Sequence, residues 1–452
     1  MMKLQWDFWK SRGQVPASPK RRFHLGVDYG TSNSKIVFRD YGARGEEKAI
    51  VILRNGSFRI PSRVCMTATE FVFGDDGKTP EDCDIYESIK MIVAADVCHD
   101  AKLYFGPPKK MPDGFSAADL AALTVWFLIS EGHRAIDTYL NRKMEGVSIG
   151  MTMGVPMSFF SDAQLRSSFL TIARRAWSLY REQGLLGPVL LIEKARRILD
   201  AHPSALVPST LDYEVRDWVR SEGEAAMWWP FQSPAIPSGP YAKVDIGAGT
   251  THASLYRIFG TAQTPKTGLA FFGAVTVPVG MDAVDSAIAK SEGLKGDCLA
   301  LRGRERSILQ TSARARNALT LVGEKIYEAY GRAWTETYHK IKGYVPELQA
   351  WREHNVFVIG GGSLVPNLVE IVRVHPGRRT PLRLATLEQP TDLIRADNKR
   401  VTGEELPFIT VAYGLSNIGL SIPEAFTPDE VPPMPDRIER IARLDHEDIY
   451  AK

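Results

Sequence analysis

Two stretches of the chain, one in each half, combine an aspartate with glycines and hydroxyl side chains. They are Asp28-Tyr29-Gly30-Thr31-Ser32-Asn33 and Asp245-Ile246-Gly247-Ala248-Gly249-Thr250-Thr251. Glycine lets backbone N–H groups approach phosphate oxygens, and the hydroxyl groups add further donors. An aspartate beside such a turn can hold Mg²⁺ through water, because Mg²⁺ usually keeps several water ligands. Either stretch alone also fits an ordinary β-turn, but the pair predicts a clamp on a phosphate chain.

A third glycine-rich turn follows the apolar run at 356–359. It consists of Gly360, Gly361, Gly362 and Ser363, and Pro366 is placed to begin a helix. Such glycines would let a base or a ribose lie against the backbone. The alternative is a strand-to-helix turn that serves packing alone. The sequence has no Gly-x-x-x-x-Gly-Lys-Ser/Thr loop, so a P-loop enzyme is not supported.

Each of the two aspartate-containing turns joins apolar, strand-like runs, which predicts two hairpins. The runs cover residues 23–28 and 35–38 in the first hairpin, and 241–246 and 253–256 in the second. Helical spacing covers residues 115–142, with Ser116 as a cap, and residues 162–185. Residues 147–155 predict a buried strand. Prolines and tryptophans within 203–240 predict an irregular connection between two lobes.

Length and composition indicate a globular protein with at least two lobes. The 452 residues exceed the ~250–300 at which single cores stop growing. Hydrophobic residues make up 44% and charged residues 24%, and a formal net charge of +3 gives no reason to expect nucleic-acid binding. The scattered cysteines predict reduced thiols. No run approaches the ~20 apolar residues of a membrane span and no secretory signal is evident, so a cytoplasmic protein is expected.

In their order along the chain, these motifs resemble the nucleotide-binding domain of DnaK-type heat-shock chaperones, which belong to the actin superfamily. The turns at 28–34 and 245–250 resemble its two phosphate motifs, and residues 360–363 with Pro366 resemble its adenosine motif. Further similar segments lie at 59–64, 74–78, 155–164 and 411–415. The resemblance implies an α/β, actin-like ATPase (ribonuclease H-like) fold. Two lobes of mixed sheet would be flanked by helices, with the nucleotide in the central cleft.

The resemblance also implies a domain organisation. Its parts are an N-terminal extension at 1–21, lobe I at 22–202 with a small subdomain at about 51–115, the connection at 203–240, lobe II at 241–423 with a small subdomain at about 286–350, and a C-terminal tail at 424–452. The sequence after Leu420 is too short for the family's peptide-binding domain. A chaperone that holds client proteins by itself is therefore not expected.

For individual residues, the resemblance implies roles in hydrolysing ATP to ADP and phosphate. Asp28 and Asp245 would place Mg²⁺ through water. Lys78 would contact the β- and γ-phosphates and stabilise the transferring charge, and Glu193 would orient the attacking water. Thr250 would bond the γ-phosphate. The remaining nucleotide contacts would come from Gly30, Thr31, Ser32, Asn33, Gly247, Ala248, Gly249, Thr251, Gly280, Gly360, Gly361, Gly362 and Ser363.

Several residues depart from the family pattern. Lys194 follows Glu193, where the family has proline and small residues, and Leu364 replaces an adenine-stacking arginine. Lys78 also fits an exposed lysine in a turn, and Glu193 also fits a solvated glutamate beside Lys194. These departures leave nucleotide binding expected and the rate of hydrolysis open.

The sequence therefore favours an ATP-dependent conformational switch that acts on a protein partner. One alternative is a bacterial actin-like protein that self-assembles into filaments, since residues 245–251 and the triple-glycine turn fit that family too. Another is an adaptor that binds ATP without hydrolysing it and docks through residues 1–20 or 424–452. The aromatic residues Trp6, Phe8 and Trp9 could instead dock on a membrane surface. A sugar kinase of the same fold would need an aspartate base that the sequence does not single out.

Overall fold

The structure is a computed structural model that describes residues 21–42, 47–74, 82–98, 110–141, 147–202, 218–261, 264–285, 313–343, 345–378, 380–417, 425–426 and 431. Several predicted features lie outside these ranges. They are Lys78, the N-terminal extension up to residue 20, residues 203–217 of the connection, residues 286–312 of the second small subdomain and nearly all of the C-terminal tail.

Three β-sheets hold the strands of the described residues. A seven-stranded sheet contains β1 (Arg22–Asp28), β2 (Asn33–Asp40), β3 (Lys48–Val51), β4 (Ile60–Pro61), β8 (Ser148–Val155), β10 (Val219–Ser221) and β16 (Leu393–Arg395). A six-stranded sheet contains β11 (Gly239–Ile246), β12 (Thr251–Thr261), β13 (Thr264–Val277), β14 (Asn355–Ile359), β15 (Arg383–Leu384) and β17 (Ala425–Phe426). A four-stranded sheet contains β5 (Val64–Met66), β6 (Glu70–Phe73), β7 (Asp84–Tyr86) and β9 (Val189–Leu191).

Helices flank these sheets and make the chain a mixed α/β structure, which confirms the predicted class. They are α2 (Ile89–Cys98), α3 (Ala117–Leu140), α4 (Met157–Ser161), α5 (Ala163–Gln183), α6 (Ile192–Ala201), α7 (Glu222–Gln232), α11 (Ala313–Ile341), α12 (Val345–Ala350), the 3-10 turns η3 (Trp351–Glu353) and η4 (Gly361–Leu364), α13 (Pro366–Val372) and α14 (Leu406–Leu415). Within the described ranges, none of the helices combines the length and the apolar character that crossing a bilayer requires.

The two large sheets share one strand order. In the first, β1, β2 and β3 form an antiparallel meander, and β8 and then β10 extend the sheet in parallel from β1. In the second, β11, β12 and β13 form the meander, and β14 and then β15 extend it in parallel from β11. Each third strand also takes a parallel neighbour, β16 on β3 and β17 on β13. One five-strand arrangement therefore occurs twice in the chain, and both predicted hairpins are confirmed.

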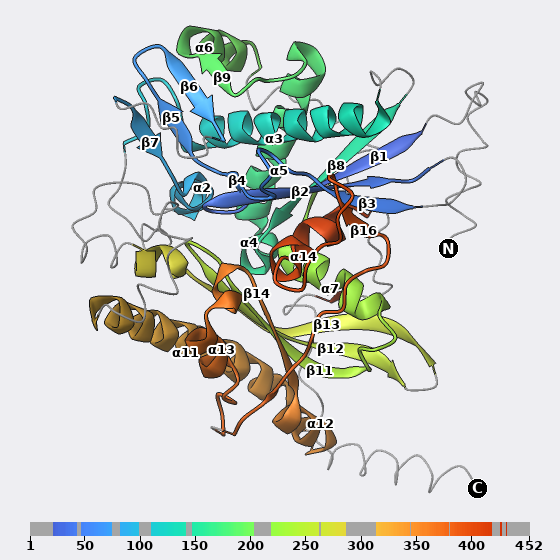
Figure 1. The fold of residues 1–452 in the computed structure, drawn as a ribbon. Helices are drawn as coiled ribbons and strands as arrows, with labels where there is room; N and C mark the ends of the chain where they lie inside the picture. The colour runs from blue at the N-terminus through green and yellow to red at the C-terminus, as the bar shows by residue number, and fades with distance from the viewer. Residues whose placement is uncertain are drawn as a thin grey trace, which may run out of the picture.

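The layers alternate between helix and sheet (Figure 1). Helix α3 covers the outer face of the seven-stranded sheet, and α11 covers the outer face of the six-stranded sheet. Between the sheets lie α7 and α14. Helix α14 packs on the first sheet through Phe408 and Ile409, and α7 packs on the second through Met227 and Phe231. The two sheets therefore face each other across this pair of central helices.

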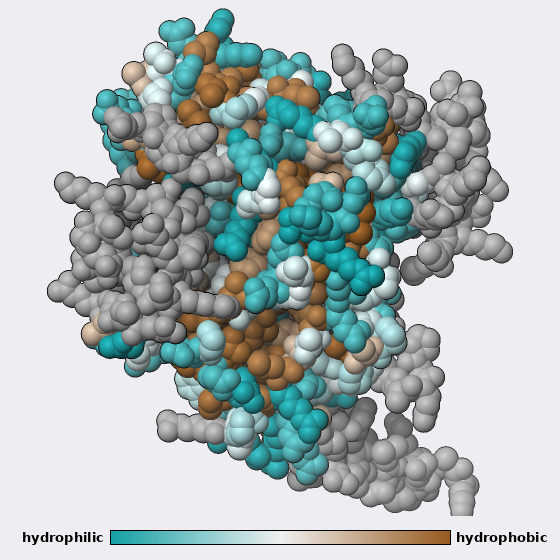
Figure 2. All heavy atoms as spheres, viewed as in Figure 1, coloured by the Kyte–Doolittle hydropathy of each residue, from teal (hydrophilic) through white to brown (hydrophobic). Residues whose placement is uncertain are grey.

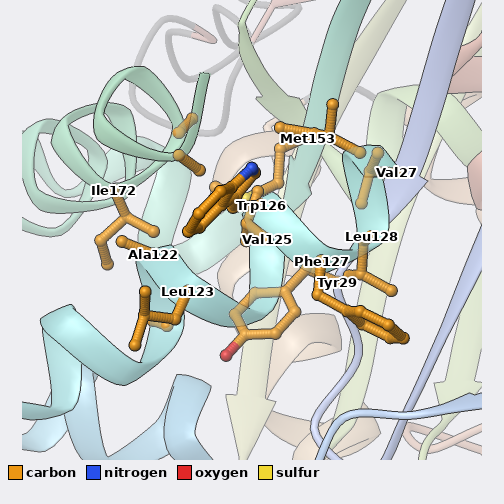
Figure 3. Packing of buried hydrophobic residues seen from close by; sticks show 14 of the residues in the cluster. Val27, Tyr29, Ala122, Leu123, Val125, Trp126, Phe127, Leu128, Met153 and Ile172 are labelled. Atoms are coloured by element: carbon orange, nitrogen blue, oxygen red, sulfur yellow. The ribbon is translucent and has the colours of Figure 1, made fainter. Parts of the chain in front are cut away.

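Helix α3 anchors the core of the first half. Ser116 caps it as predicted: its hydroxyl accepts from the Asp119 N–H, and the Asp119 carboxylate accepts from the Ser116 N–H at 2.8 Å. Trp126 and Phe127 are buried, and Figure 3 shows them together with Val27 of β1 in one apolar cluster. The helix thus fixes the back of the strand that leads to the first turn.

Helix α7 corrects the prediction of an irregular connection. Strand β10 and α7 occupy residues 219–232, inside the proline-rich segment. Ser221 starts the helix, because its hydroxyl accepts from the N–H groups of Gly223 and Glu224. Met227 and Phe231 are buried against the second sheet, and this burial stabilises the helix although Pro230 lies in its last turn.

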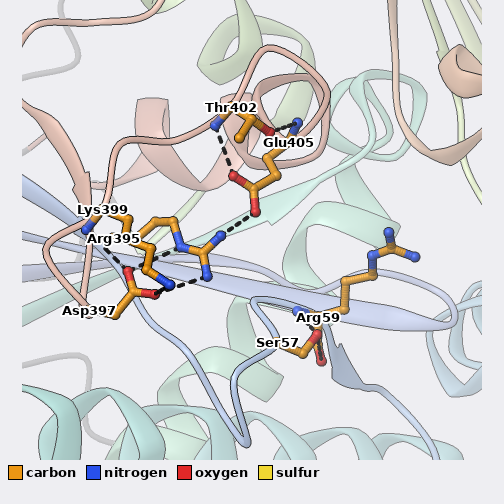
Figure 4. A network of polar contacts seen from close by, with 7 residues as sticks. All are labelled: Ser57, Arg59, Arg395, Asp397, Lys399, Thr402 and Glu405. Carbon is orange, nitrogen blue, oxygen red and sulfur yellow. Dashed lines mark hydrogen bonds and ion pairs between the residues drawn. The ribbon is translucent and has the colours of Figure 1, made fainter.

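Strand β16 and α14 correct the predicted extent of lobe II. Both were expected in the second lobe, but β16 pairs with β3 and α14 packs on the first sheet. Polar contacts hold the segment between β16 and α14 in place (Figure 4). Arg395 forms ion pairs with Asp397, at 3.1 Å, and with Glu405. The Glu405 carboxylate also accepts a hydrogen bond from the Thr402 N–H at 2.8 Å. The chain therefore crosses between the two large sheets three times, once before α7, once before β16 and once before β17.

The four-stranded sheet forms a small unit beside the first large sheet. Strands β5, β6 and β7 come from the predicted small subdomain, and β9 joins them from residues 189–191. Val189 and Leu191 are 45% and 52% exposed, and Figure 2 shows hydrophobic residues on the surface where β9 and α6 lie in Figure 1. These residues lie outside the core of the large sheets.

Candidate functional site

A single cleft between the halves gathers residues from all three predicted turns. Those lining it are Asp28, Gly30, Thr31, Ser32 and Asn33 of the first turn, Asp245, Gly247, Ala248 and Thr250 of the second, and Gly360 and Gly361 of the third. The other predicted contacts, Gly249, Thr251, Gly280, Gly362 and Ser363, are neighbours of these residues in the chain or in space. The structure therefore brings together residues that lie more than half the chain apart.

The first and second turns touch across the cleft. A Cβ on Gly249 would lie 2.6 Å from Thr31 Cγ2, so a larger residue at this position would force the Thr31 side chain to shift. The Ser32 hydroxyl donates to Asp282 Oδ2 at 2.8 Å, which adds a side-chain link between the halves. A ligand between these turns would contact both halves at once.

Two glycines hold the second and third turns in place. Gly360 has a φ of +78°, and a Cβ there would lie 2.4 Å from Asp245 Oδ1. A Cβ on Gly280 would lie 2.4 Å from the Ala248 carbonyl oxygen, while the next residue, Met281, donates its N–H to Gly247 O at 3.0 Å. Close backbone contact, more than side-chain chemistry, fixes the shape of this side of the cleft.

Backbone N–H groups in both turns remain open to a ligand. Those of Thr31 and Ser32 in the first turn, and of Ala248 and Gly249 in the second, donate to no group within the described ranges. An N–H group of this kind needs a partner, either water or a bound anion. Two facing sets of donors suit a chain of phosphates.

The cleft carboxylates are matched with lysines. Lys35 Nζ lies 3.1 Å from Asp28 Oδ2. Lys90 is only 3% exposed; its ammonium group pairs with Glu222 and donates to the Tyr29 carbonyl oxygen at 2.7 Å. The base of the first turn is therefore tied to the start of α2 and to the start of α7.

A third lysine lies deeper, on β11. Lys243 is 1% exposed, and its Nζ has no hydrogen-bond partner among the described residues. Burial lowers the pKa of Lys243, whereas Asp245, Glu222 and Asp28 favour its charged form. Burial raises the pKa of Asp245 against the effect of Lys243, and burial also raises the pKa of Glu222 against the effect of Lys90. The carboxylates and lysines thus form one interacting cluster.

Comparison with known proteins does not place this chain in a family: no protein-family model matches it, and no curated protein matches it. Any inference about the ligand of this cleft must therefore rest on the residues that line it. The open N–H groups fit a phosphate chain. The carboxylates of Asp28 and Asp245 fit Mg²⁺ held through water, because both line the cleft. No group of three or more acidic, histidine or cysteine side chains in the described part of the chain could bind a metal directly.

Glu193 does not lie with the two turns. It is exposed in the first turn of α6, directly after β9 at the edge of the four-stranded sheet, and it does not line the cleft. The prediction that Glu193 orients a water in the cleft is therefore wrong. Lys78 lies outside the described residues, so its predicted role stays a prediction.

Glu222 and Lys90 line the cleft, although the sequence reasoning named neither of them. Glu222 follows strand β10 and precedes Gly223, Ala225 and Ala226. A glutamate after a strand and before small residues is the pattern that the resemblance requires, so this signal could have identified Glu222. Lys90 stands at the start of α2 and carries no comparable local signal.

Further basic residues of the cleft were also missed by the sequence reasoning. Lys35 and Arg59 line it, and the Arg59 guanidinium lies over the Phe408 ring at 4.7 Å. Leu364, the residue expected to replace an arginine, lines the cleft as well. The basic residues give the cleft wall positive charge beside its carboxylates.

Proposed function

We propose that the chain binds ATP between its two halves and uses it as a conformational switch for a protein partner. The observation that carries this proposal is the placement of the two aspartate–glycine–hydroxyl turns. Each connects the first two strands of the repeated five-strand arrangement, and the two face each other in one cleft. A repeated sheet with a cleft between the copies supports an actin-like fold of two similar lobes.

The phosphates would lie between the turns. The open N–H groups of Thr31, Ser32, Ala248 and Gly249 would donate to phosphate oxygens, and the Thr250 hydroxyl would add a donor at the γ-phosphate. Asp28 and Asp245 would hold Mg²⁺ through water, and the ion would neutralise phosphate charge. The glycines at 360–361 would lie along the ribose and base.

Hydrolysis would use Glu222 as the base, in place of Glu193, and Lys90 to stabilise charge, in place of Lys78. Burial raises the pKa of Glu222, which brings its basicity closer to that of an effective general base. Glu222 would accept a proton from water as the water oxygen attacks the γ-phosphorus, and the bond to the β-phosphate oxygen breaks to release ADP. Lys90 would hold Glu222 in place and stabilise charge on the phosphates.

A second candidate function is an adaptor that binds ATP without turnover. The buried ion pair between Glu222 and Lys90 favours it, because a carboxylate held by an ammonium group is a weaker base than one facing water alone. The cleft would then bind nucleotide only to fix the relation of the two halves.

Calorimetric titration of the full chain with ATP and with ADP tests the proposal. Thr250→Val should weaken ATP binding by about tenfold to about 150-fold, because a hydrogen bond to a charged group is worth about 1.5–3 kcal/mol. Thr171→Val, on the exposed face of α5, is the matched control and should bind as the wild type does. If the folded wild type binds neither nucleotide at millimolar concentration, the proposal is wrong.

Phosphate release then separates the candidates. Turnover that Glu222→Gln abolishes selects the ATPase, and tight binding without release selects the adaptor. Nucleotide-dependent pelleting would select the self-assembling alternative.

A further inference from the structure

Beside the third turn, the wall of the cleft is apolar. Pro407, Phe408 and Val411 of α14 line it there, together with Leu364 of η4. A Cβ on Gly361 would lie 3.6 Å from Phe408 Cε1, so the glycine backbone and this ring are neighbours. An apolar wall suits a flat aromatic group of a ligand better than it suits a phosphate. This part of the cleft therefore fits the base of a nucleotide.

Arg59 brings a cation from the first half of the chain to this apolar wall. It directly precedes β4 and lines the cleft. Its guanidinium carbon lies 4.7 Å from the centre of the Phe408 ring and 5.5 Å from the centre of the Phe58 ring. A guanidinium group is attracted to the face of an aromatic ring, and its planar shape allows a second aromatic group to stack on it.

The backbone around Arg59 sets the direction of its side chain. The Arg59 N–H donates to the Ser57 hydroxyl oxygen at 3.0 Å, and Figure 4 shows the Arg59 side chain extending away from the ion pairs of Arg395. The Phe58 and Phe408 rings, whose centres are 5.8 Å apart, support the guanidinium group from below. Arg59 itself is only half-buried. A ligand in the cleft can therefore reach it.

We propose that the purine base of the nucleotide stacks on the Arg59 guanidinium group, with the glycines of the third turn on its other side. The inference rests on the proposed ATP site and adds a residue that contacts the base. Arg59 belongs to the first half and the third turn to the second, so the base contacts both halves, as the phosphates do. A purine offers a larger face for stacking than a pyrimidine, so ATP should bind more tightly than CTP.

Calorimetric titration of the full chain with ATP, CTP and tripolyphosphate, each in excess Mg²⁺, tests the inference. Arg59→Met keeps most of the side-chain length without the planar cation. It should bind ATP at least about fivefold more weakly, because a stacked base contributes at least this much to affinity. Its Kd for tripolyphosphate, which has no base, should change by less than about twofold. The preference for ATP over CTP should fall at least about threefold.

Two further variants separate stacking from charge and from the loss of any cation–ring contact. Arg59→Lys keeps the charge but not the planar group, and should lose about as much ATP affinity as Arg59→Met. Arg196→Met, on α6 and outside the cleft, removes a guanidinium group that lies 5.5 Å from the centre of the Phe115 ring. This control should leave every Kd unchanged.

The possible outcomes separate the inference from the proposed function. If Arg59→Met binds ATP within about twofold of the wild type, the inference is wrong and the nucleotide site still stands. Equal losses for ATP and tripolyphosphate, or full ATP affinity in Arg59→Lys, would show that Arg59 acts through its charge, and would also overturn the inference. If tripolyphosphate binds too weakly to measure, the ratio of ATP to CTP affinity decides.

Two results concern the protein as a whole. A folded wild type that binds no ATP overturns the proposed function together with the inference. If Arg59→Met does not fold, Arg59→Lys decides, since it keeps both the charge and the alkyl stem.

Discussion

The buried pair of Lys90 and Glu222 offers the sharpest test of how the cleft is held. The side chain of Lys90 is 4% exposed and that of Glu222 is 15% exposed, and the pair links α2 to the start of α7. Lys90→Met removes the ammonium group but keeps most of the stem. Glu222 then remains as a buried carboxylate without its main compensating charge.

The expected cost follows from this burial. Removing one partner of a buried ion pair costs about 3–5 kcal/mol of unfolding free energy, because the other charge is left without compensation. Replacing both partners, in Lys90→Met with Glu222→Gln, removes the stranded charge and should recover about 2–3 kcal/mol of that loss. The exposed pair Lys325–Glu328 in α11 has a separation of 2.8 Å and serves as the control. Its coupling should be only about 0.2–0.5 kcal/mol.

The pH dependence has a definite sign. Burial raises the pKa of Glu222 in the folded chain, so the folded state binds this proton more tightly than the unfolded state does. Its contribution to stability is therefore complete at low pH and is lost as the pH rises through the folded-state pKa. Without Lys90 that pKa rises further, and the penalty of Lys90→Met should shrink as the pH falls from about 8 to about 5.

Urea unfolding followed by circular dichroism and tryptophan fluorescence measures these free energies. The wild type, both single variants and the double variant form a cycle at each pH. If the single costs add to within about 0.5 kcal/mol, Lys90 and Glu222 do not interact in the folded protein and the reasoning is refuted. If Lys90→Met destabilises the protein more at low pH than at high pH, the predicted pH dependence is wrong, but the coupling of Lys90 with Glu222 still stands.

Other variants test close contacts and a buried histidine. Gly414→Ala puts a methyl group 1.9 Å from a backbone oxygen of α7 and should cost about 1–3 kcal/mol in urea unfolding, whereas Gly331→Ala meets nothing within 4 Å and should stabilise by about 0.4–1 kcal/mol. Gly360→Ala and Gly184→Ala each place a side chain on a residue with positive φ, which should lower the unfolding free energy by about 1–2 kcal/mol. Only the alanine at position 360 crowds a carboxylate of the cleft, that of Asp245, so only Gly360→Ala should abolish ATP binding in calorimetry. Burial lowers the pKa of His24 to about 3 from 6.5, so its stabilising effect is present above 6.5 and is lost as the pH falls. Between about pH 7 and about pH 5, the wild type should therefore lose about 2 kcal/mol of unfolding free energy that His24→Gln does not lose. Urea titrations of both proteins at the two pH values measure this difference.

Local sequence signals were sufficient for the elements that begin and end within a short stretch. The hairpin at Asp28 has apolar strands on both sides of a glycine turn, and α3 has both a helical period and a capping serine. In such elements the interactions that define the structure lie a few residues apart. The same holds for the hairpin at Asp245, so both aspartate-containing turns of the cleft could be predicted without knowing how the halves meet.

The partners of the cleft acids depend on contacts that no local pattern contains. Lys90 and Glu222 are 132 residues apart, and only the packing of α2 and α7 brings them together. Glu193 shares the local pattern of a glutamate after an apolar run, but β9 pairs with β6 in the small sheet and carries it away from the cleft. Strand β10 has only three residues, Val-Arg-Ser, so its apolar signal was too weak to mark Glu222.

The central helices show why a ligand in this cleft could act as a switch. Helices α7 and α14 meet backbone to backbone, since even a Cβ on Gly414 would collide with the Ala225 carbonyl. At the turns, by contrast, the halves meet through single side-chain hydrogen bonds, such as Ser32 to Asp282, each worth about 0.5–1.5 kcal/mol. A motion that opens the cleft would keep the contact between α7 and α14 and break the weaker hydrogen bonds between the turns. Phosphates that contact both turns would oppose that motion directly, because opening the cleft would separate the two sets of donors that hold them.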